Sequence, residues 1–169
     1  MSRAFLKEST LEEPEVRPNR SFVLPPGAKN LMTASGRAQL QAEYNALASR
    51  RIELSTRMGA GEEEAKREVM LIDERLRPIQ RSLETAEVVD PPNPDQRDQV
   101  RFGAWVTVRD GQETAVYRIV GVDEADPAKN AISHLSPLAR ALINAKTGDR
   151  AIVKLGAKSA QLEVLAVRY

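Results

Sequence analysis

The residues whose types and order could do chemistry are three consecutive glutamates, Glu62, Glu63 and Glu64, which follow the sequence Gly-Ala-Gly at 59–61. Carboxylates bind Mg²⁺, and one or two of them suffice when a partner and water supply the remaining ligands. Acids in the first turn of a helix also complement the helix dipole, by ~0.3–1 kcal/mol each. The residues alone favour this second interpretation and leave metal binding open.

Other catalytic chemistry is scarce in this sequence. The 169 residues include no cysteine and one histidine, His134, which excludes thiol catalysis, a disulfide scaffold and a metal site built from Cys or several His. There is no GxGxxG motif and no P-loop. We therefore expect no catalytic residues in this chain, a structural role for His134, and an accessory protein rather than an enzyme.

Charge and hydropathy limit where this protein could work and what it could bind. The 25 Lys and Arg residues nearly balance 24 Asp and Glu residues, for a net charge of +1, which argues against a protein that coats nucleic acid through bulk positive charge. No run approaches the ~20 apolar residues of a membrane span, and no apolar signal segment stands near the N-terminus. We expect a cytoplasmic monomer with no membrane contact.

Two heptad patterns surround the glutamates. Apolar residues recur at steps of four and three from Leu40 to Met58, with Arg51 as the charged interruption, and again without interruption from Ala65 to Ala86. Such patterns joined by a short turn predict an antiparallel coiled-coil hairpin, here over residues 33–88 with its tip at 59–64.

The start of the first helix and the middle of the second carry specific signals. Thr33 is a suitable N-cap, but the third residue after it is Gly36 rather than Glu or Gln, so no capping box is expected. Pro78 inside the second helix removes a backbone hydrogen bond, and we expect a kink or a local break there.

Proline-rich segments flank the hairpin. Residues 1–32 contain four prolines and few periodic apolar residues, which predicts a flexible N-terminal extension. Residues 89–99 contain three prolines with Asp and Asn and are expected to form a linker.

Residues 100–169 change to the period of strands. Two strands are predicted around the turn signal Asp110-Gly111, a third at 131–134, and a closing pair around the turn at 156–159. Ser136 and Pro137 open a helix as N-cap and first helical residue, and Gly148 is expected to end it. Strands around one short helix indicate a small domain, and the whole chain is expected to be α+β.

The order of motifs in this domain resembles the C-terminal domain of the Gre transcript-cleavage factors, GreA and GreB, with a Phe-Gly-Ala-Trp sequence typical of GreB. The hairpin resembles the family more loosely, so the resemblance covers residues 33–169. The motifs that carry it in the domain are Val100–Val106, Tyr117–Gly121, Asp123-Glu124, Ile132-Ser133, Ser136–Leu142 and Gly148-Asp149.

The resemblance implies a coiled coil followed by an FKBP-like domain, and a partner, the bacterial RNA polymerase. In such factors the globular domain docks at the rim of the polymerase's secondary channel, here through Ser136, Pro137 and Arg140. The coiled coil enters the channel, and its tip carboxylates, here the residues at 62–64, help to hold Mg²⁺ at the polymerase's own active site. Nucleic acid would be contacted only indirectly.

The tip departs from the family pattern. The family reads Gly-Asp-x-Ser/Ala-Glu-Asn, whereas residues 59–65 read Gly-Ala-Gly-Glu-Glu-Glu-Ala, and each arm lacks about two helical turns, or ~10 Å of reach. Since ~1 Å of misplacement can cost two orders of magnitude in rate, we expect a polymerase-binding elongation regulator with weak or no stimulation of cleavage. The alternatives are an active GreB-like factor that uses the tip glutamates, an FKBP-like prolyl isomerase or chaperone, and a coiled-coil adaptor that does not contact polymerase.

Overall fold

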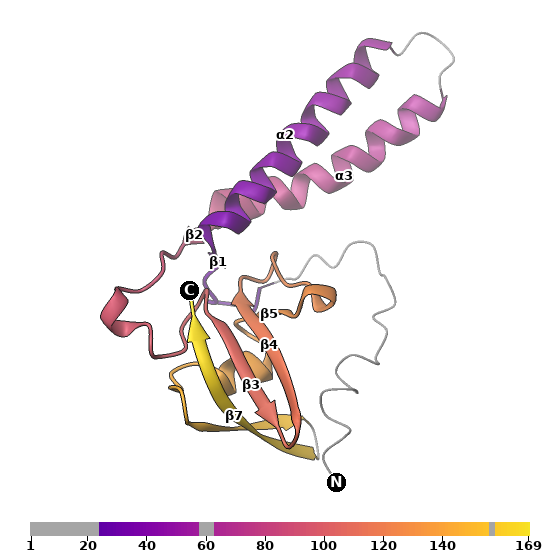
Figure 1. The fold of residues 1–169 in the computed structure, drawn as a ribbon. Helices are drawn as coiled ribbons and strands as arrows, with labels where there is room; N and C mark the ends of the chain where they lie inside the picture. The colour runs from indigo at the N-terminus through magenta and orange to yellow at the C-terminus, as the bar shows by residue number, and fades with distance from the viewer. Residues whose placement is uncertain (1–23, 58–62, 156–157) are drawn as a thin grey trace.

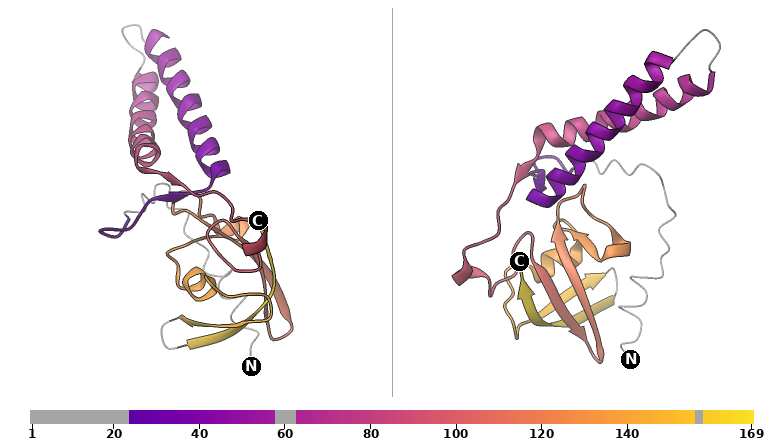
Figure 2. Two further views of the ribbon diagram at one scale, coloured as in Figure 1. Left: turned by 90° about the vertical axis from the view of Figure 1, so that its left-hand side faces the viewer. Right: turned by 45° about the horizontal axis from the view of Figure 1, so that its top comes forward.

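The segment with helical periodicity and the segment with strand periodicity form two separate parts of the structure. In the computed structural model, which describes residues 24–57, 63–155 and 158–169, the heptad segments form a helical hairpin that projects from a domain built on the β-sheet (Figures 1 and 2). This arrangement confirms the α+β class. No helix within the described residues is long and apolar enough to cross a membrane.

The hairpin consists of α2 (Ala34–Arg57) and α3 (Glu63–Thr85), which lie side by side. The predicted seam closes between them, because heptad positions from both helices form one apolar cluster whose removal from water stabilises the pair. The predicted turn at 59–61 lies outside the described residues. The cluster has Leu54, Ala65 and Ile72 buried, with Leu47, Val69 and Leu76 packed against them.

Arg51, the charged interruption of the seam, forms an ion pair between the helices. Its guanidinium donates to both carboxylate oxygens of Asp73, at 2.5 and 3.3 Å, and this hydrogen bonding lowers the pKa of Asp73. Similar pairs join Arg50 to Glu68 and Arg75 to Glu43. Because exposed pairs contribute only about 0–1 kcal/mol each, they select the register of the helices more than they hold them together.

Of the kink or local break expected at Pro78, the break does not occur. Helix α3 runs through Pro78 as one element of 23 residues. Ile72 and Ile79, which precede and follow the proline, are both buried, so packing on either side keeps the helix continuous where one backbone hydrogen bond is missing.

A short parallel pair closes the base of the hairpin. Strand β1 (Leu31–Met32) pairs with β2 (Glu87–Val88), with Leu31 opposite Glu87 and Met32 opposite Val88. Met32 is 1% exposed. The flexible extension predicted for residues 1–32 is therefore too long at its C-terminal end, because a two-residue strand is too short to produce a periodic signal. Residues 1–23 lie outside the described part of the chain.

The second domain is a five-stranded sheet in the order β5-β4-β3-β7-β6. Neighbouring strands are antiparallel except β4 and β5, which are parallel. The turn predicted at Asp110-Gly111 joins β3 to β4. The strands are β3 (Trp105–Asp110), β4 (Glu113–Val120), β5 (Ala131–Ser133), β6 (Arg150–Leu155) and β7 (Lys158–Arg168).

One face of this sheet forms the main core together with α4 (Pro137–Leu142). Buried positions alternate along β3 and along the described parts of β6 and β7, as expected for a sheet with one face covered. The buried residues of this core include Val106, Val108, Ile119, Leu142, Val153, Leu162 and Val164. Two 3₁₀ turns, η1 (Pro94–Gln96) and η2 (Pro127–Lys129), lie in the linker and between β4 and β5.

The helix predicted from Ser136 to Gly148 is shorter than expected. It ends at Leu142, and the chain then pairs with the start of the domain: Asn144 N donates to Val100 O, and Val100 N donates to Ala145 O, both at 2.8 Å. Ala145 packs against the core, so its apolar spacing comes from this pairing and not from a longer helix.

Replacing Pro78 with alanine is expected to stabilise the hairpin. The change restores an N–H donor inside α3 and removes the ring from the preceding turn. Because the propensity difference is at most ~3 kcal/mol, we expect the free energy of unfolding to rise by about 1–2 kcal/mol. Urea unfolding followed by circular dichroism at 222 nm measures it, with the exposed Arg67→Ala on the same helix as control. A lower stability of Pro78→Ala would mean that packing of the ring outweighs the missing hydrogen bond.

Candidate functional site

Two of the three tip glutamates lie within the described residues, at the free end of the hairpin. Glu63 and Glu64 form the first turn of α3, and both are exposed. Glu63 Oε1 accepts a hydrogen bond from Lys66 Nζ at 2.7 Å, while Glu62 lies outside the described residues. Within the described part of the chain, no group of three or more His, Asp or Glu side chains could hold a metal ion. These acids could therefore supply only a partial set of ligands.

The three predicted docking residues share the N-terminal turn of α4, and we call them the α4 patch. Ser136 Oγ accepts from Ala139 N at 3.1 Å, which confirms Ser136 as the N-cap. Pro137 follows as the first helical residue, and both it and Arg140 are exposed. The cap fixes the backbone of this turn, so a proline ring and a guanidinium are presented to a partner on a rigid support.

His134 lies beside this patch, which the sequence did not indicate. Its ring meets Phe102 edge to face, with centroids 5.5 Å apart. Burial lowers the pKa of the His134 imidazole and the charge of Arg140 lowers it further, whereas the carbonyl of Val120 raises it. Together these effects favour the neutral form of the imidazole.

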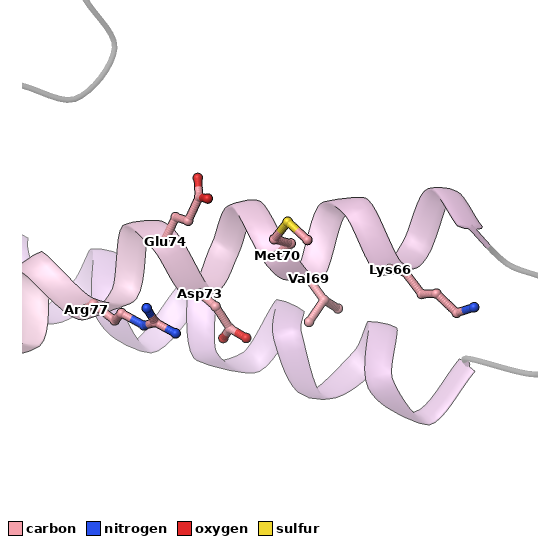
Figure 3. Close-up of a pocket in the computed structure, with 6 residues that line it drawn as sticks. All are labelled: Lys66, Val69, Met70, Asp73, Glu74 and Arg77. Atoms are coloured by element: carbon pink, nitrogen blue, oxygen red, sulfur yellow. The ribbon is translucent and has the colours of Figure 1, made fainter.

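A shallow groove of about 400 Å³ runs along α3. Figure 3 shows Met70 and Glu74 pointing away from α2, while Val69 and Asp73 point toward it. Along the groove a cation is followed by two apolar residues, two acids and a second cation, and their polar groups do not converge. Such a lining suits contact with a macromolecule better than capture of a small ligand.

The junction between hairpin and sheet domain is held by a group of side-chain hydrogen bonds that sequence reasoning missed. The Glu124 carboxylate accepts hydrogen bonds from Thr33 N at 2.9 Å, from Gly121 N at 3.1 Å and from Thr33 Oγ1. Nearby, Ser82 Oγ donates to Asp123, and Arg118 Nη2 donates to Ser35 Oγ at 3.0 Å. Both arms of the hairpin are thus bonded to the end of β4 and the loop after it.

The described fold is a projecting helical hairpin on a small β-sheet domain, and comparisons with known proteins identify its family. Residues 94–169 match the model of the C-terminal domain of the transcription elongation factors GreA/GreB. A GreA of Leuconostoc citreum is 35% identical over 151 residues, which cover 80% of this chain and 94% of that protein. The chain belongs to the GreA/GreB family of transcription elongation factors.

Other relatives match over a shorter span. A GreB of Neisseria meningitidis is 45% identical over 106 residues, which cover 62% of this chain and 64% of that protein, so the chain spans less than two thirds of the length of this relative. A solved structure of the GreA factor homolog 1 of Thermus thermophilus is 18% identical, covers 84% of this chain and all of that one, and has a TM-score of 0.39.

The lowered pKa of His134 predicts a pH-dependent stability. Because the unfolded chain binds this proton more readily than the folded one, the free energy of unfolding falls as pH falls below the ordinary value of about 6.5. Ion pairs also lower the pKa values of three carboxyl groups, those of Asp73, Asp98 and Glu163. Their protonation reduces stability mainly below about pH 4, outside the range of the histidine effect. Between pH 5 and 7, His134→Gln should therefore flatten the slope of stability against pH.

The measurement is urea unfolding at several pH values. The change in slope is bounded by one proton, or about 1.4 kcal/mol per pH unit. Between pH 7.5 and 8.5 the imidazole is neutral in both states, and the wild type and the variant should run parallel. An equal slope for both proteins between pH 5 and 7 would contradict the prediction.

Proposed function

We propose that this protein is a regulator of transcription elongation that binds bacterial RNA polymerase through the α4 patch and inserts its hairpin into the secondary channel. The observation that carries the proposal is the projecting hairpin: α3 begins with Glu63 and Glu64 at the end of the hairpin that lies away from the sheet domain (Figure 1). A hairpin that only buried apolar area would not need to extend beyond the body of the protein, because its far end packs only on itself. Family membership supports the choice of partner.

The length of the arms limits what the tip can do. Helices of 24 and 23 residues are about 35 Å long at ~1.5 Å per residue. The family pattern has arms about two turns longer, so the tip acids here would stop short of the position from which they could share a metal ion. We therefore infer weak or no stimulation of transcript cleavage.

Mg²⁺ remains a candidate ligand only in the complex. Glu62, Glu63 and Glu64 are the residues that would contribute oxygen ligands, with the polymerase supplying the others, and bound Mg²⁺ would stabilise charge on the reacting phosphate. Any hydrolysis would be the polymerase's own, and this chain would act as an accessory factor without catalytic residues. A prolyl isomerase needs an aromatic-lined pocket. The guanidinium of Arg118 lies 5.2 Å above the ring of Trp105, the one tryptophan, and it takes up a face of the ring that such a pocket would use.

Docking through the α4 patch predicts that Arg140→Glu weakens binding to RNA polymerase. Reversing one charge in a docking surface typically costs about 1.4 kcal/mol or more, or roughly tenfold in Kd. Fluorescence anisotropy of the labelled factor titrated with polymerase measures this. Arg150→Glu, an equal charge change at an exposed position of β6, is the matched control. If the two variants bind alike, docking does not use the α4 patch.

Short arms predict that the factor leaves backtracked RNA largely intact. Stalled complexes with labelled RNA are incubated with the factor, and RNA length is read on a gel. Shortening that disappears when residues 62–64 are changed to alanine, and persists in the Glu74→Ala control, would establish the active GreB-like alternative. If polymerase from lysate is not retained by the immobilised factor, the adaptor alternative replaces the proposal.

A further inference from the structure

The first turn of α2 contains half of a capping box. Thr33 Oγ1 accepts from Gly36 N at 3.0 Å, which is the standard first bond of this motif. In a complete box an acid at the position of Gly36 would reach back to the N–H of Thr33. Here that N–H donates to Glu124 Oε2 at 2.9 Å, and Glu124 lies 91 positions later in the chain, in the other domain. The box is completed across the domain junction.

Two glycines make room for this contact. A Cβ at Gly36 would lie 2.0 Å from Glu124 Oε1, and a Cβ at Gly121 would lie 2.1 Å from the carbonyl oxygen of Leu31. A side chain at position 36 would therefore displace the Glu124 carboxylate, whereas one at position 121 would push away the backbone that leads into the hairpin. Because position 36 carries no side chain, the Glu124 carboxylate can take the place that a local capping acid would occupy.

The hydrogen bonds form a directed chain from a cation to an anion. Arg118 Nη2 donates to Ser35 Oγ, which lies 3.0 Å from Thr33 Oγ1, and the latter contacts Glu124. Because a guanidinium only donates and a carboxylate only accepts, each hydroxyl must donate toward Glu124. Bonds aligned in this way strengthen one another, so the chain acts as a unit.

Both arms of the hairpin are held at this junction. Arg118 and Glu124 hold the start of α2, and Asp123 accepts from Ser82 near the end of α3. Within the hairpin, Asn30 Nδ2 donates to the Ser82 carbonyl at 3.1 Å. Attachment at both arms restricts rotation of the hairpin, whereas attachment at one arm would leave it free to swing.

We propose that Glu124 is a positioning residue that fixes the direction in which the hairpin projects, by completing the capping box of α2 from the sheet domain. In the setting of the proposed function, on which this consequence rests, direction decides where the tip lies in the channel. For a hairpin about 35 Å long, a rotation of about 15° at its base moves the tip by about 9 Å. That displacement is as large as the reach that the short arms lack.

The test measures the direction of the hairpin in the free protein. Because the chain has no cysteine, the substitutions Ser55→Cys near the tip and Lys154→Cys on β6 introduce the only two thiols for spin labels. Pulsed electron-electron double resonance then reports the distance between hairpin and sheet domain. We expect a narrow distribution with Glu124 present, and a distribution broadened or shifted by about 5 Å or more in Glu124→Ala, as the lever estimate indicates.

Four further variants, two at the junction and two controls, separate positioning from folding. Gly36→Ala raises the helix propensity of α2 yet should broaden the distribution like Glu124→Ala, because the new Cβ expels the carboxylate. Glu124→Gln keeps an acceptor for the N–H of Thr33 and should restore part of the narrow distribution. Ser49→Ala on α2 and Glu113→Ala on β4 should leave it unchanged, and circular dichroism should show retained helix in every variant.

Each outcome decides the proposal independently of polymerase. If the distance distributions of Glu124→Ala and Gly36→Ala are both as narrow as that of the wild type, the positioning role is overturned. If Glu124→Ala unfolds, the distribution of Gly36→Ala alone decides. Binding assays then separate it from the proposed function: Glu124→Ala should keep its affinity for polymerase within about twofold while its effect on elongation is lost. Absence of binding by the wild type would overturn the proposed function and leave the positioning role standing.

Discussion

The attachment of the hairpin to the sheet domain depends on the Glu124 carboxylate at the first turn of α2. The first four N–H groups of any helix lack partners within the helix, and they need an acceptor from elsewhere. For the N–H of Thr33 that acceptor is Glu124 of the other domain, which also accepts the hydroxyl of Thr33. Hydrogen bonds depend strongly on angle, so this contact sets a direction, which an apolar patch of similar size would not do.

Sequence reasoning succeeded where the signal is local and repeated. The heptads of α2 and α3, the turn at Asp110-Gly111 and the Ser136 cap each depend on residues within a few positions of one another. It was wrong where spacing was coincidental, as for Ala145, which continues a helical pattern but pairs with Val100. The tip assignments at 62–64 and the docking role of the α4 patch stay predictions.

The junction was missed because its residues are far apart in sequence, although a trace of it was present. Thr33 is an excellent N-cap, yet Gly36 occupies the position where a capping acid is favoured and where glycine weakens the helix. A local defect beside a strong local signal indicates that another part of the chain supplies what is missing. Read in this way, Gly36 predicts a partner for the N–H of Thr33, although the sequence alone does not identify Glu124.

Two independent quantities place the tip of the hairpin, and they differ in how easily they change. Length changes in whole heptads, because the seam from Leu47 to Leu76 and the pairs Arg51–Asp73 and Arg75–Glu43 must stay in register. Direction depends on one carboxylate and on the space left by two glycines, so a single substitution can alter it. A hairpin whose seam is unchanged can therefore acquire a new tip position through its base alone.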